Sequence, residues 1–268
     1  MDISSLVSGK LAIDYPAERV VRITLDDPDK RNAIDPVLHD DLARIFPLID
    51  ADPDIGAAII TGRGKAFCAG GALSDLKPED PHVAFAGQYD DVLRLINNLI
   101  DMRTPLVSAI NGAAVGAGLS LALLADISIA VDDALLIEGH LQNGLVAGDH
   151  AALIWPLLCG LAKTKYHVLL GEPLTGKAAA DCNLVSLSVP REELEERSIA
   201  IAARLAGMAP TALRMTKHVL NHWLRQAMPT FELSAALELA LLGSAECKEA
   251  FSARVQKRPG VFTGPRPF

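Results

Sequence analysis

The sequence has few aromatic residues and no long hydrophobic run. Phe, Trp and Tyr make up only 4% of its 268 residues, so Ala, Leu, Ile and Val carry most of the apolar half, which suits packed helices and buried strands. The most apolar stretch, residues 112–125, is shorter than the roughly 20 residues that a membrane-spanning helix needs, and Asp126 follows it. The N-terminus lacks the basic and apolar regions of a secretory signal. We therefore expect a cytoplasmic protein without a membrane span.

The cysteines and the charge exclude further classes. The four cysteines form no C-x-x-C pair and have no histidines at zinc-finger spacing, so we expect reduced core thiols and no bound metal. A formal net charge of -8 disfavours nucleic acid as a partner but leaves room for a small-anion pocket. Gly116-x-Gly118 lacks the third glycine of a dinucleotide-binding loop, and Ser120 lacks the glycine that follows a hydrolase nucleophile.

Strand and helix patterns alternate as far as about Val189. Alternating or continuous apolar residues predict six strands, at 11–15, 20–25, 57–61, 105–110, 127–131 and 135–137. Asp35 before Pro36 is typical of a helix start, and further helices are expected at about 83–102 and 116–125. This order predicts an α/β fold in which crossover helices join parallel strands.

No strand pattern appears from Arg191 onward. We expect two or three helices there, at about 191–207, 211–226 and 230–257. The segment 233–242 is so rich in Ala and Leu that it should be buried on more than one side. The sequence therefore predicts a core over residues 1–190 and a helical docking or oligomerisation segment over residues 191–268.

Two loops of small residues follow predicted strands, at 67–73 (FCAGGAL) and 111–120 (NGAAVGAGLS). Small side chains let a ligand approach backbone N–H groups closely. The second loop also leads into a helix, whose N-terminal end favours negative charge. One such loop could simply make a tight turn, but two converging N–H donors form an oxyanion hole. The pair therefore favours a ligand site.

Five segments, taken in order, resemble the enoyl-CoA hydratase/isomerase (crotonase) superfamily: 26–34, 65–73, 105–122, 174–185 and 257–264. The resemblance covers nearly the whole chain. It implies an α/β crotonase (ClpP-like) ββα superhelix, with a helical tail that packs chains into trimers or dimers of trimers. It also implies an acyl-CoA substrate of the kind used in fatty acid metabolism and no separate cofactor, with the thioester oxygen on the backbone N–H groups of Gly71 and Ala117.

The same resemblance assigns residues to the rest of the coenzyme A molecule. Those that would line the path of adenine and pantetheine are Ala33, Phe67 and Leu73. Candidate contacts to the phosphates are Lys30, Arg31 and Lys257. Taken singly, each of these cations is equally well explained as solvated surface charge.

The acid–base positions depart from the family pattern. Its hydratases use two glutamates, but the corresponding positions here hold Ser120 and His140, so the two-glutamate mechanism cannot be carried over. Residues two apart in an extended segment share a face, so Glu138 and His140 are expected to point into one cavity. We predict His140 as the general acid/base, titrating near neutral pH and oriented by Asp149 or Glu138.

Other roles remain open for the neighbouring residues. Asp149 follows Gly148 at a predicted helix start, where its carboxylate could cap free N–H groups instead. Ser120 is interpreted as a filler or a water ligand. His150 could be a second histidine of the pocket, although the sequence does not give the direction of its side chain.

Three functions are compatible with these residues. The leading one is an acyl-CoA lyase or isomerase, most naturally an enoyl-CoA hydratase-like enzyme with an enolate in a backbone oxyanion hole. The second is a C–C bond hydrolase of β-diketones, of the 6-oxocamphor hydrolase type, which a His and an Asp at this spacing also resemble. The third is a non-catalytic acyl-CoA-binding protein.

Overall fold

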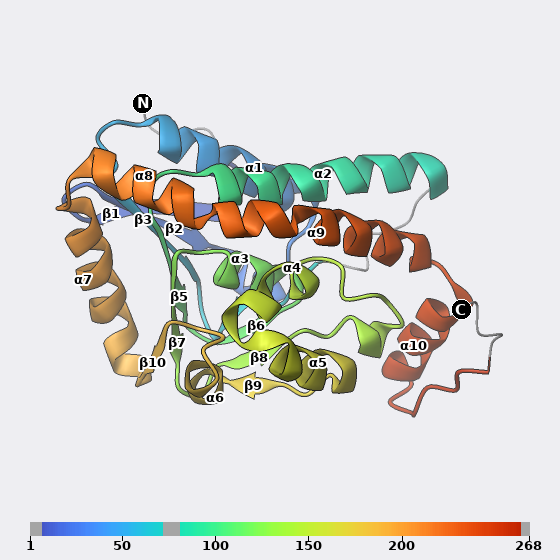
Figure 1. Cartoon of the computed structure of the whole chain (residues 1–268). Helices are drawn as coiled ribbons and strands as arrows, with labels where there is room; N and C mark the ends of the chain where they lie inside the picture. The colour runs from blue at the N-terminus through green and yellow to red at the C-terminus, as the bar shows by residue number, and fades with distance from the viewer. Residues whose placement is uncertain (1–6, 72–80, 264–268) are drawn as a thin grey trace.

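The structure of the chain is a computed structural model, which describes residues 7–71 and 81–263 (Figure 1). Its larger sheet has the strand order β1-β2-β3-β5-β7-β10. The strands are β1 (Leu11–Ala17), β2 (Val20–Leu25), β3 (Ala57–Gly62), β5 (Leu106–Ile110), β7 (Ile127–Val131) and β10 (Leu187–Val189). Apart from the antiparallel pair β1 and β2, neighbouring strands are parallel, which confirms the predicted pairing.

A smaller sheet lies beside the first and has the order β4-β6-β8-β9. It consists of β4 (Ala66–Cys68), β6 (Ala113–Val115), β8 (Leu135–Ile137) and β9 (Leu174–Thr175). The pairs β3 with β4, β5 with β6 and β7 with β8 each give one strand to each sheet. The helices α2 (Pro81–Asp101) and α3 (Ala117–Leu123) complete the first two ββα turns, as the resemblance implies.

Strand β6 corrects the sequence interpretation, which had no strand between 111 and 116. It is only three residues long and lies inside the glycine-rich loop, where no apolar alternation marks it. Because β6 pairs with β4 in parallel, with Ala114 opposite Cys68, the sheet itself sets the two glycine loops side by side.

Most of the helices cover the sheets as layers (Figure 1). Asp35 caps α1 (Pro36–Ala51) as predicted, because its Oδ1 accepts the N–H of Leu38 at 2.9 Å. Helices α1, α2 and α9 (His222–Leu241) form one layer (Figure 1). The remaining helices are α4 (Ala151–Leu158), α5 (Gly160–Leu170), α6 (Gly176–Asp181), α7 (Leu194–Ala206), α8 (Pro210–Leu220) and α10 (Ala245–Val255). None of the helices in the described ranges is long and apolar enough to cross a membrane.

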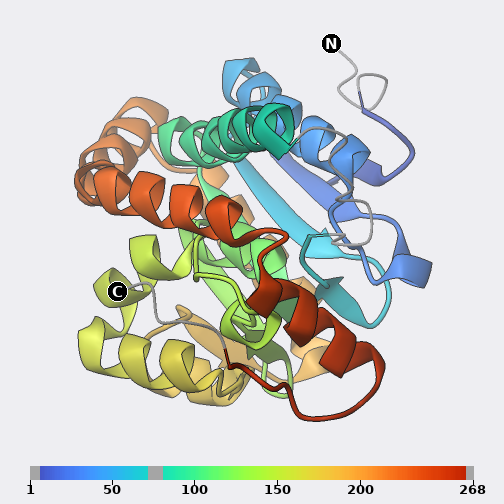
Figure 2. The same ribbon diagram turned by 90° about the vertical axis from the view of Figure 1, so that its right-hand side faces the viewer.

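The helical segment after residue 190 is packed onto the core. Helix α7 contacts β2, β3 and β5 of the larger sheet, and α9 contacts α2 and α4. The helix expected over 230–257 is in fact two, because the chain turns at Gly243, which has a φ of +79°. The turn at Gly243 places α10 against the short helix η4 (Leu141–Asn143), which follows β8 (Figure 2).

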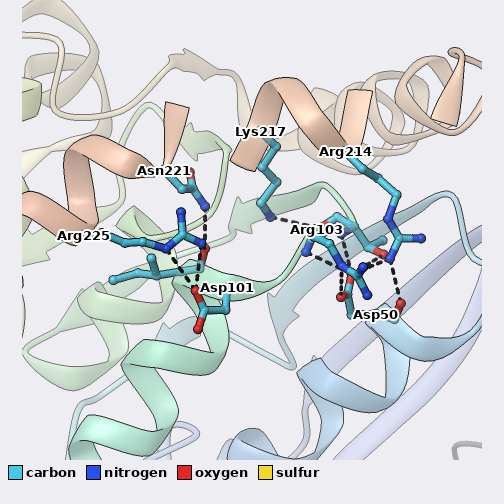
Figure 3. A network of polar contacts seen from close by, with 9 residues as sticks. Asp50, Asp101, Arg103, Arg214, Lys217, Asn221 and Arg225 are labelled. Atoms are coloured by element: carbon cyan, nitrogen blue, oxygen red, sulfur yellow. Dashed lines mark hydrogen bonds and ion pairs between the residues drawn. The ribbon is translucent and has the colours of Figure 1, made fainter. Parts of the chain in front are cut away.

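Ion pairs fasten the C-terminal helices to the core (Figure 3). The carboxylate of Asp50, at the end of α1, pairs with Arg214 of α8 at 2.9 Å and with Arg103 at 3.0 Å. It also accepts the N–H of Thr104 at 2.7 Å. Two further contacts from these helices are Lys217 to Asp126 at 2.7 Å and Arg225 to Asp101 at 2.8 Å.

Candidate active site

The two glycine loops meet at the backbone. Gly70 has a φ of +89°, and a β-carbon there would lie 2.7 Å from the carbonyl oxygen of Val115 and 3.9 Å from the nitrogen of Ala117. Gly71, the next residue, is exposed and pairs with Ile34 through a parallel bridge. The structure therefore brings the predicted donor residues Gly71 and Ala117 onto neighbouring stretches of main chain. Side chains larger than hydrogen would not fit at Gly70.

A buried amide holds the first loop in place. Asn32 is fully buried, and its side-chain nitrogen donates to the carbonyl oxygens of Arg63, Ala66 and Phe67 at 3.0–3.1 Å. Its main chain lies in the left-handed region, with a φ of +57°, which asparagine tolerates better than most residues. Asn32 thereby ties the segment before α1 to strand β4, directly ahead of the glycines.

His140 lies at the centre of a buried polar cluster. Its Nδ1 is hydrogen-bonded to the Glu138 carboxylate, which also accepts the backbone N–H of His140 at 3.2 Å. On the other side of the ring, Nε2 faces Oε1 of Glu238 at 3.2 Å and Oδ2 of Asp149 at 3.6 Å. A β-carbon on Gly116 would lie 3.6 Å from the ring. The cluster therefore adjoins the loop that carries Ala117.

The predicted contact between Glu138 and His140 is present, but the local backbone differs from the extended segment expected. Gly139 has a φ of +82°, and the chain turns into η4 at this point. The turn folds the imidazole back onto the carboxylate two residues earlier. Glycine adopts the left-handed region without strain, and this turn requires it. The contact between Glu138 and His140 therefore depends on Gly139 between them.

The charges of the cluster control its protonation. Burial alone would lower the pKa of His140, but the charge of Asp149 and the hydrogen bonds to Glu138 and Glu238 outweigh it and raise the pKa well above its usual value. Burial opposes the ionisation of Asp149 as well, yet the positive charges of His140 and His150 bring its pKa to about 2. The carboxylates around the ring therefore favour its protonated form, the imidazolium, more strongly than in a free histidine.

Glu238 behaves differently from the other carboxylates. Burial raises its pKa, and the charges of Asp149 and Glu138 raise it further, against the hydrogen bond to His140, which lowers it. Glu238 therefore takes up a proton more readily than Asp149, on the other side of Nε2.

The sequence interpretation missed Glu238. A signal was present, because it is the single charged residue in the apolar segment 233–242. Gly148 makes its approach possible, since a β-carbon there would lie 2.3 Å from Oε2 of Glu238. Helix α9 therefore supplies a side chain to the site as well as covering it.

Asp149 does not cap a helix, contrary to the alternative considered above. The N-cap of α4 is His150, and the carboxylate of Asp149 is hydrogen-bonded to Nδ1 of that histidine. Ser120 is buried near them. Its single hydroxyl proton serves either the carbonyl of Gly116, at 3.4 Å, or the Asp149 carboxylate, whose charged form it stabilises.

Three side chains of this cluster could also approach a cation together. Ligand atoms of Glu138, His140 and Asp149 all lie within 4.8 Å of one another. Metal binding requires a neutral imidazole, whereas the charges of the surrounding carboxylates favour the protonated ring. A cation and the ring proton would therefore compete for the same place.

The residues assigned to coenzyme A fall in different environments. Ile34 N–H donates to Gly70 at 2.8 Å and Ala69 N–H to Arg31 at 3.0 Å, so the loop of Lys30, Arg31 and Ala33 borders the first glycine loop. Lys30 and Arg31 are exposed and Ala33 is half-buried, as ligand contacts require.

The other three residues assigned to coenzyme A are Phe67, Leu73 and Lys257. Phe67 is completely buried in the core, and its place along the path of adenine and pantetheine stays a prediction. Leu73 lies outside the described residues. Lys257 is exposed at the end of α10 and forms no ion pair among the described residues.

Comparisons with known proteins agree with this architecture. A sequence profile of the family described as Enoyl-CoA hydratase/isomerase matches residues 16–265. A probable enoyl-CoA hydratase of Mycobacterium bovis, echA8, is 31% identical, over 92% of this chain and 95% of its own length. A putative enoyl-CoA hydratase of Thermus thermophilus is also 31% identical, over 91% and 97%. The crystal structure of an enoyl-CoA hydratase/isomerase from Mycobacterium paratuberculosis superposes with a TM-score of 0.85 at 30% identity, over 92% of this chain and 98% of that one.

Proposed function

The chain belongs to the enoyl-CoA hydratase/isomerase family, and from that premise we propose that it is a lyase or isomerase acting on coenzyme A thioesters. The observation that carries the proposal is the meeting of the two glycine loops beside the His140 cluster. A thioester oxygen bound by the N–H groups of Gly71 and Ala117 would have its α-carbon close to groups that donate and accept protons.

The loops supply the electrostatic part of the reaction. Removing a proton from the α-carbon, or adding a nucleophile to the β-carbon of an enoyl thioester, moves negative charge onto the thioester oxygen. Backbone N–H groups that already point at that oxygen stabilise the enolate without having to reorient, and one such donor contributes about 3 kcal/mol. The small side chains at Gly70 and Ala117 leave the main chain accessible for this contact.

His140 supplies the proton. The imidazolium, anchored through Nδ1 by Glu138, can donate from Nε2 to the carbon of an enolate. Glu238 faces the same nitrogen and has a raised pKa, so it can take a proton from an attacking water in a hydration. In an isomerisation, the same pair would move a proton from one carbon to another. In either role the proton that Glu238 has taken up passes to Nε2, 3.2 Å away, so the histidine regains its charged form and the glutamate its negative charge.

One observation favours a second candidate, a C–C bond hydrolase of β-diketones. An imidazole flanked by carboxylates stands where the hydratases of this family use two glutamates. In such a hydrolase, water adds to one carbonyl carbon, the bond to the central carbon breaks, and the enolate that leaves takes a proton from the imidazolium. The products are a carboxylic acid and a ketone, and no coenzyme A is needed.

Self-association of the chain is part of the proposal. Helices α8 and α9 expose Met215, Val219 and Trp223 by about two thirds each. Large apolar side chains that gather on one face of a molecule mark an interaction surface. We propose that these helices pack copies of the chain together in the trimer or dimer of trimers that the family resemblance implies.

Exchange of the α-protons of butyryl-CoA in D₂O, followed by mass spectrometry, tests the proposal without assuming a final product. We expect exchange with the native protein and a loss of about 10²- to 10⁴-fold in the exchange rate of His140→Ala, with butyryl-CoA affinity by calorimetry nearly unchanged.

Hydration of crotonyl-CoA distinguishes lyase from isomerase activity. Cleavage of a cyclic β-diketone without acyl-CoA binding would replace the proposal with the second candidate. Binding without exchange would leave a non-catalytic acyl-CoA-binding protein.

A further inference from the structure

His150 is a fully buried histidine beside the site to which the proposed reaction gives no role. Its backbone carbonyl accepts the N–H groups of Leu153 and Ile154, at 3.0 and 2.9 Å, and so begins helix α4. Its side chain makes no capping hydrogen bond to that helix. The ring instead turns toward the preceding residue, where Nδ1 is hydrogen-bonded to Oδ1 of Asp149. The start of α4 therefore does not require an imidazole here.

While the Ser120 hydroxyl donates to Gly116, three buried polar atoms at this place have no hydrogen-bond partner among the described residues: Oδ2 of Asp149, Nε2 of His150 and Nε1 of Trp155. Buried polar atoms are nearly always paired, so a concentration of exceptions in one short segment calls for an explanation. Oδ2 of Asp149 lies 3.6 Å from Nε2 of His140, which is too far for a hydrogen bond at rest and close enough to form one after a small movement.

We propose that His150 is a positioning residue for the acid–base site: by donating its Nδ1–H to Oδ1 of Asp149, it turns Oδ2 toward Nε2 of His140. The inference rests on the proposed function, in which His140 moves protons. A carboxylate is planar, so fixing one oxygen fixes the direction of the other. Without a donor on Oδ1, the carboxylate of Asp149 could rotate and offer either oxygen, or neither, to the imidazolium.

The surroundings of His150 keep its ring in this orientation. The indole of Trp155, five residues further along the chain in α4, packs at a ring-centroid distance of 6.1 Å and an angle of 56°. Both side chains are almost completely buried, at 0 and 1% exposure, so a flip of the imidazole would have to displace the core. A flipped ring would present a carbon atom to Asp149 and lose the hydrogen bond.

The acidic groups that face His140 come from three parts of the fold. Glu138 precedes the turn after β8, Asp149 precedes α4, and Glu238 projects from α9. Glu138 and Glu238 are held directly by the ring nitrogens. Asp149 is the carboxylate whose alignment depends on His150. A change at His150 should therefore act on His140 through Asp149.

Two substitutions distinguish positioning from packing. In His150→Asn the amide nitrogen can occupy the place of Nδ1 and still donate to Asp149, whereas His150→Leu fills the space without a donor. We expect the leucine variant to lose about 10- to 100-fold in kcat with KM nearly unchanged. The acid limb of its kcat profile should move to higher pH, because an Asp149 without its donor binds a proton more readily. The asparagine variant should recover most of the native kcat and pH profile.

A measurement on the free protein keeps this inference separate from the proposed function. With ¹⁵N-labelled histidine, NMR titration follows His140 without any substrate, and its pKa should fall in His150→Leu and return in His150→Asn. If no variant turns over an acyl-CoA, the proposed function fails while the titration still tests the positioning. Equal behaviour of the leucine and asparagine variants in kcat and in titration would overturn the inference. So would a native pH profile in the leucine variant.

Discussion

Oε1 of Glu238 lies 3.2 Å from Nε2 of His140, so helix α9 near the C-terminus completes a cluster that begins in the turn after β8. The glutamate is held there by the tight packing of α9 over Gly148. The four predictions below test this cluster, the backbone donor beside it and the contacts that hold the C-terminal helices.

The first concerns the charge of Glu238. Glu238→Gln removes a negative charge that faces the imidazolium, so the pKa of His140 should fall, as NMR titration of the ring can measure. Catalytic activity should fall by about 10²-fold or more if Glu238 also accepts the proton of water. Glu232→Gln, an exposed change on the same helix, is the matched control. An unchanged titration of His140 would contradict the contact.

The second concerns the N–H of Ala117. Ala117 is the first residue of α3, a position where proline is tolerated because the N–H has no partner within the helix. Ala117→Pro should therefore remove the proposed donor while the chain stays folded, and kcat should fall by about 10²- to 10³-fold. Circular dichroism and thermal unfolding check the fold. Native turnover in a folded proline variant would exclude this N–H from the oxyanion hole.

The third concerns Gly148. A β-carbon there would lie 2.5 Å from Cβ of Glu238 and 2.8 Å from the backbone oxygen of Ser234, so α9 has to move away. Gly148→Ala should lower the free energy of unfolding by about 1–3 kcal/mol, measured with urea, and reduce activity as well. Gly207→Ala is the control, because a β-carbon there would have no neighbour closer than 3.5 Å. Equal stabilities of the two variants would refute the close approach.

The fourth concerns Asp50 and pH. Burial would raise the pKa of Asp50, but hydrogen bonds from Thr104 and Arg103 and the charge of Arg214 lower it below its usual value. A carboxyl with a lowered pKa stabilises the fold above its unfolded-state pKa, near 4, and loses that contribution as the pH falls through the folded-state value.

Asp50→Ala should therefore cost about 1–3 kcal/mol of unfolding free energy at pH 7, because Thr104 and Arg214 lose their acceptor. The difference from the native protein should shrink as the pH is lowered below 4. Asp54→Ala, an exposed change nearby, should show neither effect. A difference that is constant with pH would rule out an ionised Asp50 as the cause.

The sequence was sufficient for features that depend on local patterns. Apolar periodicity located most strands and the helix that begins at Pro36, because each buries one face along a continuous stretch. The two glycine loops could be predicted to converge, since both follow strands that the ββα order brings together. The short strand β6 escaped prediction because its residues are as small as those of the loop around it.

The candidate site was predictable only in part, for a physical reason. Glu138, His140 and Asp149 lie close together in the sequence, and their contacts depend on turns within one segment. Glu238 reaches them through the packing of α9 against α4, which no local pattern encodes. The protonation of His140 also depends on that packing, because its pKa reflects the sum of three carboxylates rather than the histidine alone.

The position of Glu238 has a consequence for the order of synthesis. A growing chain can form both sheets and the glycine loops once residue 189 has left the ribosome, and it can then already bury His140 against Glu138. The acid–base cluster still lacks one carboxylate until α9 has been made. A nascent chain could therefore have a folded core well before its acid–base cluster is complete. Enzymatic activity should be among the last properties to appear during translation.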